Sequence, residues 1–244
     1  DMHFEPWQWA LAIVAALLVG VAKTGMGGLG MLAVVLFAQI MPAKQATGIV
    51  LPLLCFGDLV AVASYRQHAK WNYLWRLFQW QTAGIVIGYL ALDRINERQA
   101  KWLIGTIVIA LVALHLIRRK KHGHEAEHGA WFPPAIGVLA GFTTLVANAA
   151  GPLMAIYLLA MRLPKMDFVG TGAVFFLLIN LFKVPFMVDL GLVTKASFTL
   201  NLMLAPAVFV GTWLGRKILM RIEQRVFENL ALILSALAGL KLLF

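Results

Sequence analysis

The sequence has few of the features that mark soluble enzymes or secreted domains. It contains a single cysteine, Cys55, in 244 residues, so an intramolecular disulfide and a CxxC metal or redox motif are both excluded. Only 13% of the residues are charged and 61% are hydrophobic, whereas soluble domains have roughly 25% and 45–50%. This shortage of charge points to a protein that resides in a membrane.

Long apolar runs take up most of the sequence. A helix rises about 1.5 Å per residue, so about 20 apolar residues cross a hydrocarbon core about 30 Å thick. None of the runs shows the two-residue alternation of a membrane β-barrel. We therefore predict an all-α polytopic membrane protein, in contact with a lipid bilayer. The expected full spans are Thr47–Tyr65, Tyr73–Leu92, Ala100–Ile117, Phe168–Val188, Ala196–Leu214 and Phe227–Leu243.

The charge that is present is mostly basic. The net charge is +10, a value that nucleic-acid-binding domains also reach. The lysines and arginines, however, lie in short loops beside the apolar runs, which is how membrane proteins set their orientation. We therefore expect no nucleic-acid partner.

The chain contains an internal repeat of about half its length. Asp58 corresponds to Asn180 and Pro42 to Pro164, both at an offset of 122 residues. Each half then reads as two short apolar runs around a break, followed by three full spans. We predict a first transmembrane repeat over residues 1–117, a polar cytoplasmic linker loop over residues 118–130 and a second transmembrane repeat over residues 131–244.

The short runs are too short to cross a bilayer alone. They hold 16 and 13 residues in the first half and 16 and 12 in the second, which reach roughly 18–24 Å as helices. If both pairs are re-entrant hairpins, 13 lysines and arginines fall on one side of the membrane and 6 on the other. If every element crosses, the division is 10 and 9, so the rule that the positive side is cytoplasmic favours the hairpins.

These counts predict two inverted repeats, each a broken or re-entrant helical hairpin plus three transmembrane helices, about eight helical elements in all. Inverted repeats of this kind occur in many secondary transporters. Both termini would then lie outside the cell. A broken, tilted span in place of each hairpin is the alternative.

The break in the first half is glycine-rich and reads KTGMGGLG from Lys23 to Gly30. Glycines let the backbone turn sharply and let a ligand approach the amides, and the helix that follows directs free N–H groups at that point. In the second half, Asn148 is a good helix-capping residue and Pro152 suits the first helical turn. A second helix would therefore also direct free N–H groups at its break. Two helix N-termini and the Lys23 ammonium would together bind an anion near the bilayer midplane. The predicted substrate-binding residues are Lys23, Thr24, Gly25, Gly27, Gly28, Asn148, Ala149 and Gly151.

Simpler interpretations of these polar residues stay open. The glycines would also allow close helix packing, and Lys23 would then extend its amine toward the membrane surface. Polar groups inside spans are functional candidates, so we assign a pathway or coupling role to Asp58, Asn180 and Lys183. An ion pair between Asp58 and Lys183 would instead be structural. Three other residues either line the path or form hydrogen bonds between helices: Gln79, Gln81 and Asn201.

Evidence for catalysis or cofactor binding is weak. Gly25–Gly30 matches the pattern GxGxxG, but no βαβ unit surrounds it and no acidic residue follows about 20 positions later. The nucleophile motif GxSxG is absent from the sequence. The loop His122–His128 holds metal-ligand residue types in a flexible setting. We therefore expect no enzymatic activity, no metal and no cofactor.

With these residues in view, the chain resembles the sulfite exporter TauE/SafE family over nearly its whole length. The resemblance rests on the glycine-rich break, on its counterpart NAAGPLMAIYLLAM from Asn148 to Met161, and on the half-length repeat. It implies a bacterial-type inner-membrane protein that moves sulfite, organosulfonates or related sulfur anions out of the cell. It also implies that Lys23–Gly28 and Asn148–Gly151 take part in substrate binding.

The residues and the resemblance together predict a membrane transporter that exports a small sulfur-containing anion by alternating access around a midplane site. An anion channel, or a carrier of a different small anion, is the alternative. The sequence leaves open whether the protein forms a homodimer.

Overall fold

The computed structural model describes residues 4–25, 28–41, 43–91 and 130–243, with scattered residues between 96 and 117. Within these residues every regular element is a helix, which confirms the predicted all-α class. The span expected at Ala100–Ile117 and the linker over residues 118–130 fall largely outside the described residues. The helices are α1 (Pro6–Ala22), α2 (Gly28–Phe37), α3 (Ala43–Tyr65), η1 (Arg66–His68), α4 (Trp71–Ala91), α6 (Phe132–Ala147), α7 (Ala150–Ala160), α8 (Lys165–Asp189), α9 (Lys195–Arg221) and α10 (Gln224–Leu243).

Local sequence signals set the helix boundaries. α9 begins at Lys195 because Thr194 and Ser197 form a reciprocal cap. The Ser197 N–H donates to Thr194 Oγ1 at 3.2 Å, and the Thr194 N–H donates to Ser197 Oγ at 2.9 Å. α8 ends two residues before Gly191, whose φ of 67° suits a residue without a side chain.

Each half begins with two short helices around a break, as predicted. α1 and α2 hold 17 and 10 residues, and α6 and α7 hold 16 and 11. At 1.5 Å per residue these helices are about 15–26 Å long. None of the four is long enough to cross a hydrocarbon core of about 30 Å alone.

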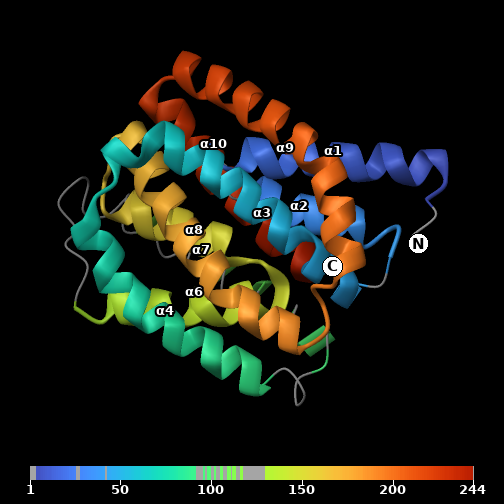
Figure 1. The fold of residues 1–244 in the computed structure, drawn as a ribbon. Coiled ribbons are helices and arrows are strands. Elements are labelled where there is room, and N and C mark those ends of the chain that lie inside the picture. Colours follow the sequence, from blue (N-terminus) through green and yellow to red (C-terminus); the bar gives the residue numbers. More distant parts are fainter. Residues whose placement is uncertain are drawn as a thin grey trace.

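Helices of one half pack against helices of the other along two equivalent interfaces (Figure 1). α1 lies along α9, and α6 lies along α4. A Cβ added to Gly20 of α1 would overlap the carbonyl oxygen of Val208, and one added to Gly141 of α6 would overlap that of Gln81. Only glycine fits at either point because the helix backbones touch. Gly20 and Gly141 correspond in the repeat at an offset of 121, so the repeat relates the two interfaces.

α3 and α8 are repeat mates and run side by side in opposite directions through the middle of the molecule (Figure 1). Gly48, near the start of α3, touches Leu192, which follows α8. Lys70, which follows α3, binds Asp167 in the first turn of α8. Because the mates meet in antiparallel orientation, superposing one half on the other turns it over, which is the relation that inverted repeats require.

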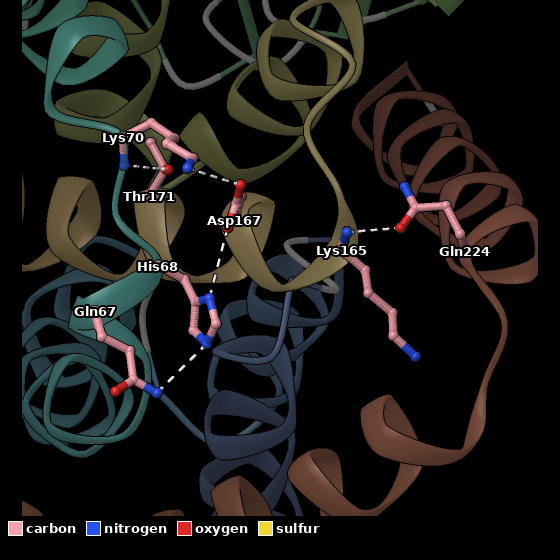
Figure 2. Close-up of polar contacts among 7 residues, drawn as sticks. All are labelled: Gln67, His68, Lys70, Lys165, Asp167, Thr171 and Gln224. Carbon is pink, nitrogen blue, oxygen red and sulfur yellow. Dashed lines mark hydrogen bonds and ion pairs between the residues drawn. The ribbon is translucent and has the colours of Figure 1, made fainter.

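A polar cluster fixes the start of α8 to its neighbours (Figure 2). Lys70 Nζ lies 3.0 Å from the Asp167 carboxylate, and the Lys70 N–H donates to Thr171 Oγ1 at 2.9 Å. The Lys165 N–H donates to the side-chain oxygen of Gln224 at 2.6 Å. Lys70 and Lys165 therefore lie at the same end of the bundle. The hairpin arrangement requires this, whereas the arrangement in which every element crosses would place them on opposite sides.

Part of the surface suits lipid. Three described helices are long and apolar enough to cross a membrane by length and composition: Gln45–His68, Lys165–Asp189 and Lys195–Arg221. α4 and α10, of 21 and 20 residues, also form and cover most of two further expected spans. Large apolar side chains are exposed along α9, a surface more favourable in lipid than in water; they include Leu202, Met203, Phe209 and Trp213. The protein is an all-α membrane protein.

Candidate functional site

The two helix breaks line one cavity in the interior of the bundle, which we call the polar cavity. It offers about 40 Å³ to the centres of water-sized molecules. Since ~10–15 Å³ of such space holds one water, roughly three or four water-sized atoms fit, which is the size of a small oxyanion. The polar cavity is lined by Ala22, Lys23, Gly30, Leu54, Thr144, Asn148, Ala150, Gly151, Phe176 and Asn180.

Lys23 enters the polar cavity from the C-terminal end of α1. Its N–H bonds to the Gly20 carbonyl at 3.1 Å, so the ammonium lies near the negative end of the helix dipole. Lys23 Nζ is 2.7 Å from Asp58 Oδ1 and lies over the Phe176 ring, 5.3 Å from its centroid. Asp58 is fully buried and accepts a 2.7 Å hydrogen bond from Asn180 through its other oxygen. Asp58 thus binds two residues of the cavity wall, Lys23 and Asn180, without itself lining the cavity.

Lys183 binds two other residues of the cavity wall, Thr144 and Asn148. Its fully buried amine donates to the Thr144 carbonyl at 3.2 Å, to Thr144 Oγ1 at 3.3 Å and to Asn148 Oδ1. Three acceptor oxygens match the three N–H donors of a protonated lysine. Asn148 Nδ2 donates in turn to the Thr47 carbonyl at 3.0 Å. The Asn148 amide therefore joins α8 of the second half to α3 of the first.

Two predictions about these residues are wrong. Asn148 does not cap the start of α7, because the residue before that helix is Ala149. Asn148 instead ends α6 in the left-handed conformation, with φ 51° and ψ 32°, a conformation that asparagine adopts more readily than most residues. The structural pair of Asp58 with Lys183 does not form either. Asp58 pairs with Lys23, because α1 ends beside the middle of α3.

The interpretation in which Lys23 reaches the membrane surface also fails. Only 6% of its side chain is exposed, and its amine pairs with a carboxylate that is fully buried. A snorkelling lysine keeps its amine in water. Lys23 is instead directed into the bundle.

A second cavity adjoins the first and is mostly apolar. It shares Ala22, Lys23, Gly151 and Phe176 with the polar cavity. The rest of its wall comes from Gly25, Met154, Ala155, Leu158, Phe168, Val169, Gly172 and Ala173. A ligand at Lys23 therefore has polar groups on one side and apolar side chains on the other.

The residues predicted to bind substrate divide into three groups. Lys23, Asn148 and Gly151 line the polar cavity, and Gly25, with φ 95°, lines the apolar one. Thr24 and Ala149 are fully buried without lining either cavity, and the Thr24 hydroxyl donates to the Val21 carbonyl at 2.7 Å. Gly28 is the first residue of α2, and Gly27 lies outside the described residues.

The remaining polar candidates lie away from both cavities. Gln81 and Asn201 are fully buried, and within the described ranges no hydrogen-bond partner is found for either side chain. Gln79 is exposed. None of the three lines the polar or the apolar cavity.

Sequence reasoning missed several residues of the polar cavity, among them Thr144 and Phe176. Thr144 stands 121 positions after Lys23, the offset that relates Gly20 to Gly141, so the repeat itself could have identified it. Phe176 gave no comparable signal, because an aromatic residue in an apolar helix usually packs in the core.

The charges around the polar cavity favour an anion. Lys23 and Lys183 supply two ammonium groups and Asp58 one carboxylate, and the three residues are between 0% and 8% exposed. With all three groups ionised, their charges sum to one positive charge in an environment where an uncompensated charge is costly. A bound anion would neutralise it, while Thr144, Asn148 and Asn180 offer hydrogen-bonding groups around the same space.

A helical membrane protein with a buried cationic cavity between two broken helix pairs has the architecture of small-solute membrane transporters. Residues 12–242 match the family described as Sulfite exporter TauE/SafE. The chain therefore belongs to this family, as its sequence resemblance predicted. Among curated proteins and among solved structures, none matches the chain.

Across the described residues no group of three His, Cys, Asp or Glu side chains is placed to hold a metal ion. The loop His122–His128, which ends in the sequence HEAEH, has the spacing of a zinc-binding helix. It lies outside the described residues, so the expectation that it binds no metal is untested.

Proposed function

We propose that this protein exports a small sulfur-containing anion, such as sulfite, an organosulfonate or a related oxyanion, across the cell inner membrane. The observation that carries the proposal is the Lys23 ammonium, which lines a cavity formed by both helix breaks. The family as a whole implies transport of sulfur anions. The site adds a fixed positive charge and a volume suited to one oxyanion.

Helix N-termini add to the attraction. Ala150 and Gly151 open α7 and line the polar cavity, and Gly30 lies in the first turn of α2 and lines it too. The first-turn N–H groups of a helix have no partners within the helix, and they carry the positive end of its dipole. An oxyanion beside them would accept hydrogen bonds directly from the backbone.

The repeat supports alternating access. The cavity wall contains Lys23 of the first half and Thr144, Asn148 and Gly151 of the second, and the two halves interlock through equivalent interfaces. In transporters built from inverted repeats, one conformation opens the central site to one side, and exchanging the conformations of the halves opens it to the other. The end that holds Lys70 and Lys165 would face the cytoplasm, because the hairpin arrangement concentrates basic residues there. Both termini would then lie outside.

The test is anion binding and transport by purified protein, using sulfite, thiosulfate, sulfoacetate, taurine and sulfate. Lys23→Gln keeps a polar side chain but removes the charge, so it should weaken anion binding by about 1–3 kcal/mol. Because this change leaves Asp58 buried without a cation, the double variant Lys23→Gln/Asp58→Asn removes both charges of the pair. It should still bind more weakly than the wild type, because the Lys23 amine that would contact the anion is absent. Lys165→Gln, which alters a lysine at the end of the bundle, should bind as the wild type does.

Two results would contradict the proposal. One is unchanged anion affinity in a folded Lys23→Gln protein, which would remove Lys23 from the site. The other is flux in liposomes that neither saturates nor supports counterflow, which would indicate a channel instead of a carrier.

A further inference from the structure

Lys23 has a counter-ion within the protein itself. Asp58 Oδ1 lies 2.7 Å from the Lys23 amine, and the Coulomb attraction between two buried opposite charges at this distance is strong. A substrate that approaches Lys23 therefore meets an ammonium whose charge is largely cancelled. For the substrate to use the full charge of Lys23, the Asp58 carboxylate must be neutralised.

We propose that Asp58 is an internal counter-anion that takes up one proton when a divalent anion binds at Lys23 and stays ionised when a monovalent anion binds. The inference rests on the proposed function, since it needs an anion in the polar cavity. The protonation state of Asp58 would then set how many protons are bound together with each substrate.

The charge balance of the site supports this assignment. With Asp58 ionised, the two lysines and the one carboxylate sum to +1, which a monovalent anion neutralises. A divalent anion in the same site would leave −1 in the interior of the membrane, where an uncompensated charge is unfavourable. One proton on Asp58 raises the site to +2 and restores neutrality.

The geometry makes Asp58 the group that can accept this proton. Its two oxygens contact Lys23 and Asn180, and both of these residues line the polar cavity. A change in its protonation therefore acts on two points of the binding surface at once.

The other charged and titratable groups around Asp58 are less suited to the role. Lys23 faces it from the end of α1, and Lys183 faces it from α8. The three N–H donors of Lys183 are all directed at Thr144 and Asn148, so a change in its protonation would act on those two residues and not on Lys23 and Asn180. Cys55, one turn earlier on α3, is neutral as a thiol and already carries its proton.

The experiment counts protons taken up on binding to the intact protein in detergent. Calorimetric titrations in two buffers of different ionisation enthalpy give this number directly. Thiosulfate serves as the divalent probe and methanesulfonate as the monovalent one, because neither titrates near neutral pH, whereas sulfite does. Asp58→Asn is the test variant, and its amide can still accept the hydrogen bond from Asn180. Asp167→Asn, at the end of the bundle beside Lys70, is the matched control.

We expect the wild type to take up close to one proton per thiosulfate and none per methanesulfonate. Its thiosulfate affinity should fall about tenfold for each unit rise in pH, as linkage to a single proton requires. Asp58→Asn should bind thiosulfate without proton uptake and without pH dependence, and Asp167→Asn should behave as the wild type does.

Thiosulfate binding without proton uptake in the wild type would overturn the inference and leave the anion transporter intact. Equal uptake in Asp58→Asn and wild type would assign the proton to another group and would also overturn it. If Asp58→Asn does not fold, the wild-type proton count and pH dependence still decide the question. Failure of every anion tested to bind would instead overturn the proposed function, and the inference with it.

Discussion

Adding a single methyl group where α4 touches α6 should destabilise the protein measurably. In Gly141→Ala the new Cβ would lie 2.8 Å from the backbone nitrogen of Ile85, and it would overlap the Gln81 carbonyl oxygen more closely still. Ordinary contact begins at 3.4 Å and the Gln81 carbonyl oxygen would be 2.1 Å away, so relieving the overlap needs a shift of about 1.3 Å, the difference between the two distances. The atoms in the way belong to the backbone and cannot rotate aside. Overpacking of this kind costs about 1–3 kcal/mol, and we expect the upper part of that range.

The measurement is thermal unfolding in detergent. For a chain of this length about 1 kcal/mol corresponds to roughly 2–4 °C in Tm, so Gly141→Ala should unfold about 4–10 °C below the wild type. Gly20→Ala, its repeat mate at the α1–α9 interface, should show a loss of similar size. Gly172→Ala is the control, because its Cβ would lie 3.6 Å from Leu158 Cδ1 in ordinary contact, and alanine favours the helix by up to about 1 kcal/mol. A Gly141→Ala protein as stable as the Gly172→Ala protein would refute the close packing of α4 on α6.

Two further predictions concern orientation and driving force. In a Cys55→Ala background, single cysteines at Arg119 and Arg162 should both be shielded from external, impermeant thiol reagents while one at Lys44 reacts; labelling of position 162 but not 119 from outside would contradict the hairpin arrangement. An anion leaving an inside-negative cell gains about 2.3 kcal/mol per charge per 100 mV, so an inside-negative potential should drive preloaded methanesulfonate out of proteoliposomes. Methanesulfonate flux that ignores the potential and follows a proton gradient would rule out passive, electrogenic export of this anion.

The helices and their order could be predicted from the sequence, because apolar runs of this length specify membrane helices almost without regard to tertiary contacts. The repeat could also have predicted one tertiary contact, which we did not infer from it. Asp58 and Asn180 hold corresponding positions on α3 and α8, and two helices related by a two-fold axis meet at their equivalent residues. The hydrogen bond between them follows from that relation.

The partners of the two buried lysines could not be predicted in the same way. Which residue of α3 faces the end of α1 depends on the rotation of both helices, and the apolar sequence around Asp58 shows little periodicity from which to infer it. The left-handed turn at Asn148 was missed for a related reason. Asparagine is suited both to starting and to ending a helix. The hydrogen bonds that its side-chain amide forms here are with Lys183 and Thr47, which are distant in sequence.

Helices of the first half pack against helices of the second, and this pairing affects the order in which the protein can assemble during synthesis. Both close helix interfaces join the first half to the second, so α1 is made long before α9, the helix against which Gly20 packs. The first half must enter the membrane with its glycine face uncovered and remain so until most of the chain has followed. Contacts that join the two ends of a chain close late and slowly. A nascent chain halted within the linker would therefore contain all its first-half helices and neither of the interfaces that hold the finished bundle together.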